Sequence, residues 1–161
     1  IQGRPLMHVI AAKAVCFREC MTDEFKAYAR AMVDNAAVLG ESLLEKGFHL
    51  VSGGTDNHLL LVNVSNKGLT GKDMEELLER VGITANKNTV PFDQESPFVT
   101  SGIRLGTPAL TTRGMGPDQM RVIADIMDRA VQNRNDEEIL AKLHAESEEL
   151  CRQFPLYPGM S

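Results

Sequence analysis

The sequence lacks the cysteine content of a disulfide framework. It has three cysteines in 161 residues, Cys16, Cys20 and Cys151, and an odd number cannot all pair within one chain. Cys16 and Cys20 would lie one helical turn apart, with no second Cys or His pair at the spacing of metal ligands. We therefore expect reduced, packed thiols, no metal site and a cytoplasmic protein.

Basic clusters and long apolar runs are also missing. The formal charge is -5, the sequence pI is about 5.4, and no run is rich in Lys and Arg, which argues against nucleic acid or an anionic membrane as the main partner. No apolar run approaches the ~18 residues of a spanning helix, and the amino end does not have the layout of a signal peptide. Hydrophobic residues make up 43% of the chain, which is enough for one domain core.

The spacing of apolar residues, the helix caps and the turn residues predict helices that alternate with short strands. Strands are expected over 48–51, 58–64, 83–86 and 101–105, and helices over 6–17, over 22–46, over 70–81, from Pro117 onward and after a cap at Asn135. This order predicts an α/β fold in which helices cover a small, mainly antiparallel sheet.

The first expected helix, over 6–17, is apolar on nearly every face. Such a helix is typical of burial between packed layers or against a partner subunit. His8 lies inside it, with no Ser, Cys or carboxylate at a helical neighbour position, so we interpret it as a core or interface histidine. The next helix should bury Phe25, Met32, Ala36, Leu39 and Leu43.

The stretch Asn86–Pro108 has the residue types of a binding site. Two Asn flank Lys87, two prolines bound an acidic turn, and the chain then resumes a period of two. Ile103 and Leu105 should therefore face one side of a strand and Arg104 the other. An arginine held on a strand suits planar, two-point capture of a carboxylate or phosphate. The alternative is an arginine that is solvated or paired with a nearby Asp or Glu.

Two other segments leave alternatives open. Asp56-Asn57-His58 could contribute chemistry, but Asp and Asn also satisfy the backbone of tight turns, and this second interpretation is favoured. Ser96-Pro97-Phe98 could line a site or form a plain turn with a Phe anchored in the core.

Several motifs in a fixed order resemble the carboxyl-terminal portion of serine hydroxymethyltransferases, also called glycine hydroxymethyltransferases. Besides Asn86–Pro108, they are Gln2-Gly3 followed by Pro5-Leu6-Met7-His8, Val51 to His58, Leu69-Thr70-Gly71-Lys72, and Thr111 to Gly114. These enzymes use pyridoxal 5'-phosphate (PLP) to exchange serine and glycine with tetrahydrofolate. The resemblance implies the C-terminal domain of the aspartate-aminotransferase-like (fold type I) PLP enzymes, with connecting helices over 1–46 and the small domain over 47–161.

The resemblance also implies roles for individual residues. Arg104 would bind the carboxylate of serine or glycine, Asn88 would hydrogen-bond the pteridine ring of folate, and Ser96-Pro97-Phe98 would line the folate pocket. Gly3 and Arg4 would lie near the cofactor phosphate of the neighbouring subunit in a homodimer or a dimer of dimers. Arg4 stands where the family usually has a second Gly, so its side chain should hinder a close approach of the backbone. The alternative is that its positive charge itself meets the phosphate.

The lysine that forms the Schiff base with PLP lies, in the family, in a Thr-rich segment upstream of Gln2. No such segment is present, and the sequence begins with Ile, so we expect a fragment that lacks the catalytic lysine and is inactive alone. Lys87 is interpreted as a loop lysine near the folate site. The alternatives are the small domain of another fold type I enzyme, such as an aminotransferase, and a non-catalytic binding or oligomerisation module.

Overall fold

The computed structural model describes residue 3 and residues 5–156. The first half of this region contains α1 (Met7–Glu19), α2 (Asp23–Glu45), β1 (His49–Leu50), β2 (Leu59–Asn63), the 3-10 helix η1 (Ser65–Lys67) and α3 (Gly71–Arg80). The second half contains β3 (Asn86–Asn88), β4 (Gly102–Gly106), α4 (Pro108–Thr112), α5 (Pro117–Gln132) and α6 (Glu137–Gln153). The expected order of helices and strands is confirmed, with α4 and η1 as additions.

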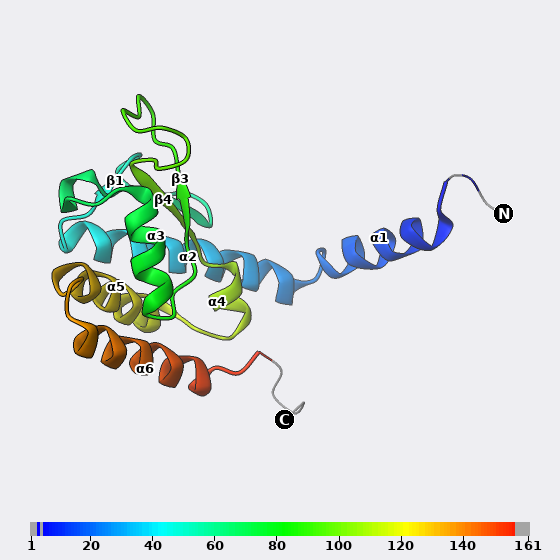
Figure 1. Cartoon of the computed structure of the whole chain (residues 1–161). Helices are drawn as coiled ribbons and strands as arrows, with labels where there is room; N and C mark the ends of the chain where they lie inside the picture. Colours follow the sequence, from blue (N-terminus) through cyan, green and yellow to red (C-terminus); the bar gives the residue numbers. More distant parts are fainter. Residues whose placement is uncertain (1–2, 4, 157–161) are drawn as a thin grey trace.

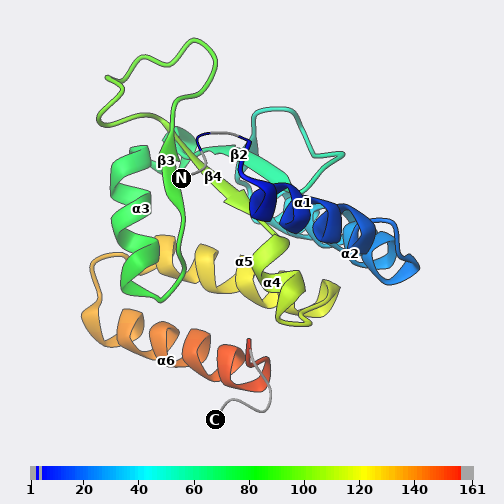
Figure 2. The same ribbon diagram turned by 90° about the vertical axis from the view of Figure 1, so that its right-hand side faces the viewer.

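The four strands form one antiparallel sheet in the order β1-β2-β4-β3. The side chains that β2 and β4 turn to one face, Leu60, Val62, Ile103 and Leu105, are buried in the core. Helices α2, α3 and α5 pack on this face, and α6 packs outside them against α5 and α3 (Figure 2). The predicted α/β fold, a small antiparallel sheet covered by helices, is therefore confirmed.

Helix α3 has the boundaries that its sequence signals predict. The Thr70 hydroxyl accepts a hydrogen bond from the backbone N–H of Asp73 at 3.1 Å, and the Asp73 carboxylate accepts one from the backbone N–H of Thr70 at 3.0 Å. This reciprocal capping box satisfies two N–H groups that the helix itself leaves unbonded. Gly82, with a φ of +77°, follows the helix in the left-handed region that favours glycine.

Helix α1 has no buried residue and projects away from the domain (Figure 1). Phe17, for example, is 64% exposed. The prediction that α1 is buried between layers of this chain is therefore wrong, because no described element lies against it. Burial of α1 against a partner subunit stays a prediction. The second half of α2 enters the core through Ala36, Leu39 and Leu43, as expected, but Phe25 is exposed and Met32 is only half-buried.

Three elements differ from the sequence prediction. Strand β3 begins at Asn86 rather than covering 83–86, because the residues that pair with β4 are Asn86 to Asn88. A short helix, α4, replaces the expected irregular connection after Pro108. Helix α6 is capped by Asp136 rather than Asn135, because the Asp136 carboxylate accepts hydrogen bonds from two backbone N–H groups, each at 3.1 Å.

The described residues also bear on the predicted absences. All three cysteines are free; Cys16 is exposed rather than packed, because α1 lies outside the core. Within residue 3 and residues 5–156, no group of three or more His, Cys, Asp and Glu side chains could hold a metal ion. None of the described helices combines the length and apolar composition that crossing a membrane requires. The division into 1–46 and 47–161 stays a prediction.

Candidate functional site

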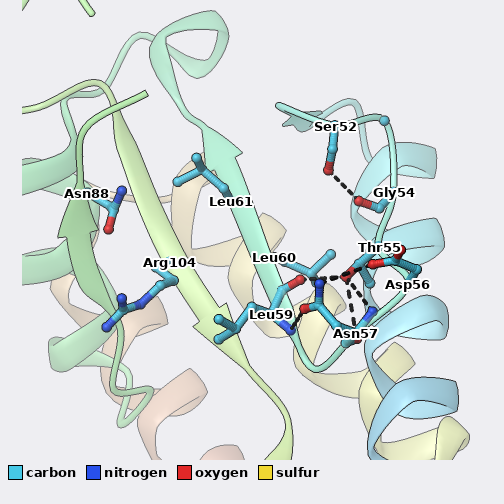
Figure 3. Close-up of a pocket in the computed structure, with 11 residues that line it drawn as sticks. Ser52, Gly54, Thr55, Asp56, Asn57, Leu59, Leu60, Leu61, Asn88 and Arg104 are labelled. Atoms are coloured by element: carbon cyan, nitrogen blue, oxygen red, sulfur yellow. Dashed lines mark hydrogen bonds between the residues drawn. The ribbon is translucent and has the colours of Figure 1, made fainter. Parts of the chain in front are cut away.

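Arg104 occupies the middle of β4, the strand between β2 and β3. Its backbone position pairs with Leu61 on one side and Asn86 on the other. Ile103 and Leu105 are buried while Arg104 is exposed on the opposite face of the sheet, which confirms the predicted alternation. No hydrogen bond or ion pair joins the Arg104 guanidinium to another residue in the described part of the chain. Among the pocket residues drawn in Figure 3, no dashed line reaches it. The alternative in which Arg104 pairs with a nearby Asp or Glu is therefore wrong for the described part of the chain.

An open pocket of about 640 Å³ lies in front of Arg104. Arg104 lines it together with Asn88 of β3, residues Leu59–Leu61 of β2 and the loop Ser52–Asn57 (Figure 3). Arg104 and Asp56 are the charged residues among those that line this pocket. A guanidinium without a partner, beside apolar side chains and an amide, can bind a small molecule that carries a carboxylate.

The loop Ser52–Asn57 forms the pocket wall that the sequence interpretation did not include in the site. Two of its side chains bond to the backbone of Leu59, the first residue of β2: the Thr55 hydroxyl donates to the Leu59 carbonyl at 2.7 Å, and the Asn57 side-chain oxygen accepts from the Leu59 N–H at 2.8 Å. The turn interpretation is therefore right for Asn57. The Gly53-Gly54 pair and the polar residues after it were the available signal, but polar turn residues alone do not distinguish a wall from a plain turn.

Asn88 lies near Arg104 because of the strand register. Asn86 pairs with Arg104, and Asn88 pairs with Gly102, two residues away on β4. Residues two apart on a strand share one face of the sheet. The Asn88 amide donates to the Thr89 carbonyl at 2.7 Å, and the residue lines the pocket. The structure thus brings together two of the predicted site residues, Arg104 and Asn88.

Ser96, Pro97 and Phe98 lie elsewhere, on the segment that connects β3 to β4, here called the 89–101 loop. This loop extends beyond the sheet and the helices (Figures 1 and 2). The Ser96 carbonyl accepts hydrogen bonds from the backbone N–H groups of Val99 and Thr100 at 3.0 and 2.9 Å. Phe98 is 83% exposed, so it does not anchor a turn in the core. These three residues do not line the Arg104 pocket.

The base of the 89–101 loop is organised by Asp93, which sequence reasoning did not single out. One carboxylate oxygen accepts from the N–H groups of Val90 and Ser101 at 3.1 and 3.0 Å. The other accepts from the Ser101 hydroxyl at 2.6 Å and from the Glu95 N–H at 3.0 Å. The Ser101 hydroxyl first, and the three backbone N–H groups with it, hold the pKa of Asp93 well below its usual range.

Lys87 does not have the position of a nucleophile. It lies on β3, rather than on a loop, and its ammonium is 3.0 Å from a carboxylate oxygen of Glu75 on α3. The backbone N–H of Lys87 donates to the other oxygen of the same carboxylate at 2.9 Å. These bonds lower the pKa of Glu75, the backbone bond contributing most. Lys87 thus joins α3 to the edge of the sheet.

The other lysines are similarly placed. Five more pair with a carboxylate: Lys26, Lys46, Lys67, Lys72 and Lys142. The remaining one, Lys13, is exposed on α1. Among the described residues, no lysine lines the pocket of Arg104.

The two residues assigned to the cofactor phosphate lie near the start of the chain. Gly3 is exposed, and a Cβ at its position would meet no atom within 4 Å. Arg4 lies outside the described residues. No cradle for a phosphate group is therefore formed around Gly3 by the described part of this chain.

Comparison with known families bears on this site. A family model described as serine hydroxymethyltransferase matches residues 1–127. The match spans more than three quarters of the chain. It includes all four strands, Arg104, Asn88 and the 89–101 loop, whereas α6 lies beyond it.

Proposed function

The chain belongs to the serine hydroxymethyltransferase family, and on that premise we propose that it forms the carboxyl-terminal part of a glycine hydroxymethyltransferase. The enzyme would transfer the hydroxymethyl group of serine reversibly to tetrahydrofolate, which gives glycine and 5,10-methylenetetrahydrofolate, with PLP as cofactor. We expect it to act in the cytoplasm. Within this chain we assign contacts to the substrates rather than the bond-breaking chemistry.

The observation that carries the proposal is the unpaired guanidinium of Arg104 on the central pair of strands. A strand position fixes the backbone, and the buried neighbours Ile103 and Leu105 fix the register. The fork of an arginine can then bind both oxygens of an amino-acid carboxylate. Arg104 would thereby hold the carboxylate of serine or glycine in one orientation while the reaction takes place at the other atoms of the substrate.

The described residues do not fit the covalent attachment of PLP. When bound through a lysine, this cofactor supplies an electron sink for the amino-acid substrate. Six lysines of the chain are paired with carboxylates and Lys13 is on the exposed helix α1. We therefore assign the attachment lysine to another part of the enzyme and derive no step through the cofactor here. A role for Gly3 and Arg4 at the cofactor phosphate of a neighbouring subunit remains a proposal.

The folate contacts are assigned to Asn88 and to Ser96, Pro97 and Phe98. An amide can donate and accept hydrogen bonds at once, as the edge of a pteridine ring requires. Asn88 is two residues from the strand position opposite Arg104, so folate and the amino acid would meet at the same face of the sheet. The exposed ring of Phe98 offers apolar surface for the folate.

We also expect the enzyme to be a homodimer or a dimer of dimers. Helix α1 presents exposed apolar side chains, among them Met7, Val15 and Phe17, and none of its residues is buried by the described chain. A partner surface over this helix would remove that apolar area from water.

The experiment that tests the proposed function replaces Arg104 by Lys and by Ala in the enzyme that contains this chain. Both variants should raise the dissociation constants of glycine and serine at least about tenfold, since loss of one partner of a desolvated charge pair costs ~2 to 5 kcal/mol and each 1.4 kcal/mol is a factor of ten. Calorimetry measures these constants, and PLP occupancy should be unchanged.

The matched control is Arg121→Ala, which removes an exposed arginine from α5. It should leave glycine binding unchanged. If Arg104→Lys and Arg104→Ala bound glycine normally but lost folate binding, Arg104 would belong to the folate site and the assignment would be wrong.

A further inference from the structure

The backbone of the 89–101 loop is strained on both sides of its tip. Phe92 and Thr100 have φ values of +59° and +60°, in the left-handed region that side chains with a Cβ rarely adopt. Such conformations persist where surrounding bonds impose them. Asp93 directly follows Phe92, and its partner Ser101 directly follows Thr100. The hydrogen bonds of Asp93 therefore lie next to the two residues with positive φ and can hold them in that conformation.

One carboxylate joins the two ends of the loop. Asp93 accepts hydrogen bonds from Val90 at the start of the loop, from Glu95 in the turn, and from both the N–H and the hydroxyl of Ser101 at its end. All four donors are neutral, and no described cation pairs with Asp93. Bonds to an ionised acceptor are stronger than neutral ones. An amide at this position would lose that charge and would replace one acceptor oxygen by a donor.

The end of the loop is also fixed to α3. The N–H groups of Gly71 and Lys72, at the start of that helix, donate to the carbonyls of Thr100 and Val99 at 2.9 and 3.0 Å. A Cβ at Gly71 would overlap the Thr100 hydroxyl and the carbonyl oxygen of Gly102. The base of the loop is thus held closely, whereas Ser96, Pro97 and Phe98 at its tip are exposed. Because the tip packs on nothing in the described chain, its position depends on the base.

We propose that Asp93 is a positioning residue that locks the 89–101 loop through Val90, Glu95 and Ser101, so that Ser96, Pro97 and Phe98 are presented to folate in one arrangement. The inference rests on the proposed function for the identity of the ligand. A loop ordered before binding loses less conformational freedom when the ligand arrives. Loss of the lock should weaken folate binding and leave the amino-acid site, on β4, as it is.

The test compares Asp93→Asn and Ser101→Ala with Glu95→Gln in the enzyme that contains this chain. Glu95→Gln is the matched control. Only the backbone N–H of Glu95 takes part in the lock, and Gln keeps it, whereas the exposed Glu95 side chain forms no hydrogen bond or ion pair with a described residue. Three quantities are measured: amide hydrogen exchange of the 89–101 segment, the dissociation constant of tetrahydrofolate and that of glycine. Exchange in β4 reports whether the domain stays folded.

Asp93→Asn should accelerate exchange in the loop and raise the dissociation constant of tetrahydrofolate, each about tenfold, as expected when charge-assisted hydrogen bonds are lost. Ser101→Ala should act in the same direction with a smaller effect, because the backbone N–H of Ser101 remains. Glycine affinity and exchange in β4 should stay within about twofold of wild type. Glu95→Gln should match wild type throughout.

The inference would be overturned by loop exchange that stays at the wild-type rate in Asp93→Asn, or by folate affinity that is unchanged although the loop exchanges faster. A loss of glycine and folate affinity together would reduce Asp93 to a general structural residue and would also overturn it. A wild-type enzyme that binds no folate would contradict the proposed function instead, and the exchange rates would still decide whether Asp93 locks the loop.

Discussion

Asn35 on α2 is a buried polar residue that fixes the segment after β4. It is 1% exposed, and its amide donates to the Thr111 hydroxyl and to the Met115 carbonyl, both at 3.0 Å. Asn35→Ala leaves these acceptors buried without a donor, so we expect a loss of about 1 to 3 kcal/mol in the free energy of unfolding. Urea unfolding measures it. The control Glu41→Ala, at an exposed position of the same helix, should change stability by less than about 0.5 kcal/mol; an equal effect of the two changes would refute the role of Asn35.

For single residues, the sequence predicted the features that depend only on neighbours along the chain. The alternation around Arg104 follows from Ile103 and Leu105 alone. Asp93 was missed because its two bonds to Ser101, at the other end of the loop, form only when β3 and β4 pair. Phe98 shows the same limit. Its sequence left open either a wall of the site or a plain turn with the ring anchored in the core, and the fold excludes the core anchor, because the ring is exposed where the loop extends beyond the sheet.

Glu75 of α3 links this helix to β3, because its carboxylate accepts hydrogen bonds from both the backbone N–H and the ammonium of Lys87. Its pKa is lowered in the folded chain, so the folded state binds the proton more weakly than the unfolded state. The resulting stability is present above the unfolded pKa and is lost as the pH falls. We expect the free energy of unfolding of the wild type to decrease between about pH 5 and pH 3. The free energy of unfolding of Glu75→Gln should decrease less over the same range.

Chemical denaturation at several pH values measures this difference. Asp73 contributes in the same direction, because its pKa is lowered by the side chain and the backbone N–H of Thr70, and it is unchanged in both proteins. Glu79→Gln, on the exposed side of α3, is the control and should keep the wild-type pH dependence. A Glu75→Gln curve parallel to wild type would show that the link to Lys87 contributes no stability that depends on pH.

Elements with local start and stop signals were predicted with nearly correct boundaries. Helix α3 is the example, with Thr70 before it and Gly82 after it. Strand β3 was misplaced because its limits are set by its pairing with β4, which is distant in the chain. Helix α1 was expected to be buried because its composition is apolar, but composition does not say which molecule covers a helix.

For the whole chain, the pairing of its lysines predicts the response to PLP. We expect that the isolated 161 residues form no stoichiometric aldimine and do not interconvert serine and glycine, because the lysines near the sheet are engaged by carboxylates. The measurement is absorbance in the aldimine band after addition of PLP and dialysis. A band that survives dialysis and disappears in Lys87→Ala would contradict this expectation.

The order of the strands in the sheet also has a consequence for synthesis. Strand β2 has β1 on one side and β4 on the other, and β1 has only two residues. While the ribosome makes the chain, most of the run Leu59–Val62 has no strand to pair with until Gly102–Gly106 has emerged. An apolar strand left without a partner is prone to associate with other chains. The emergence of the strand that carries Arg104 therefore also ends the period in which most of β2 lacks a partner and is open to association with other chains.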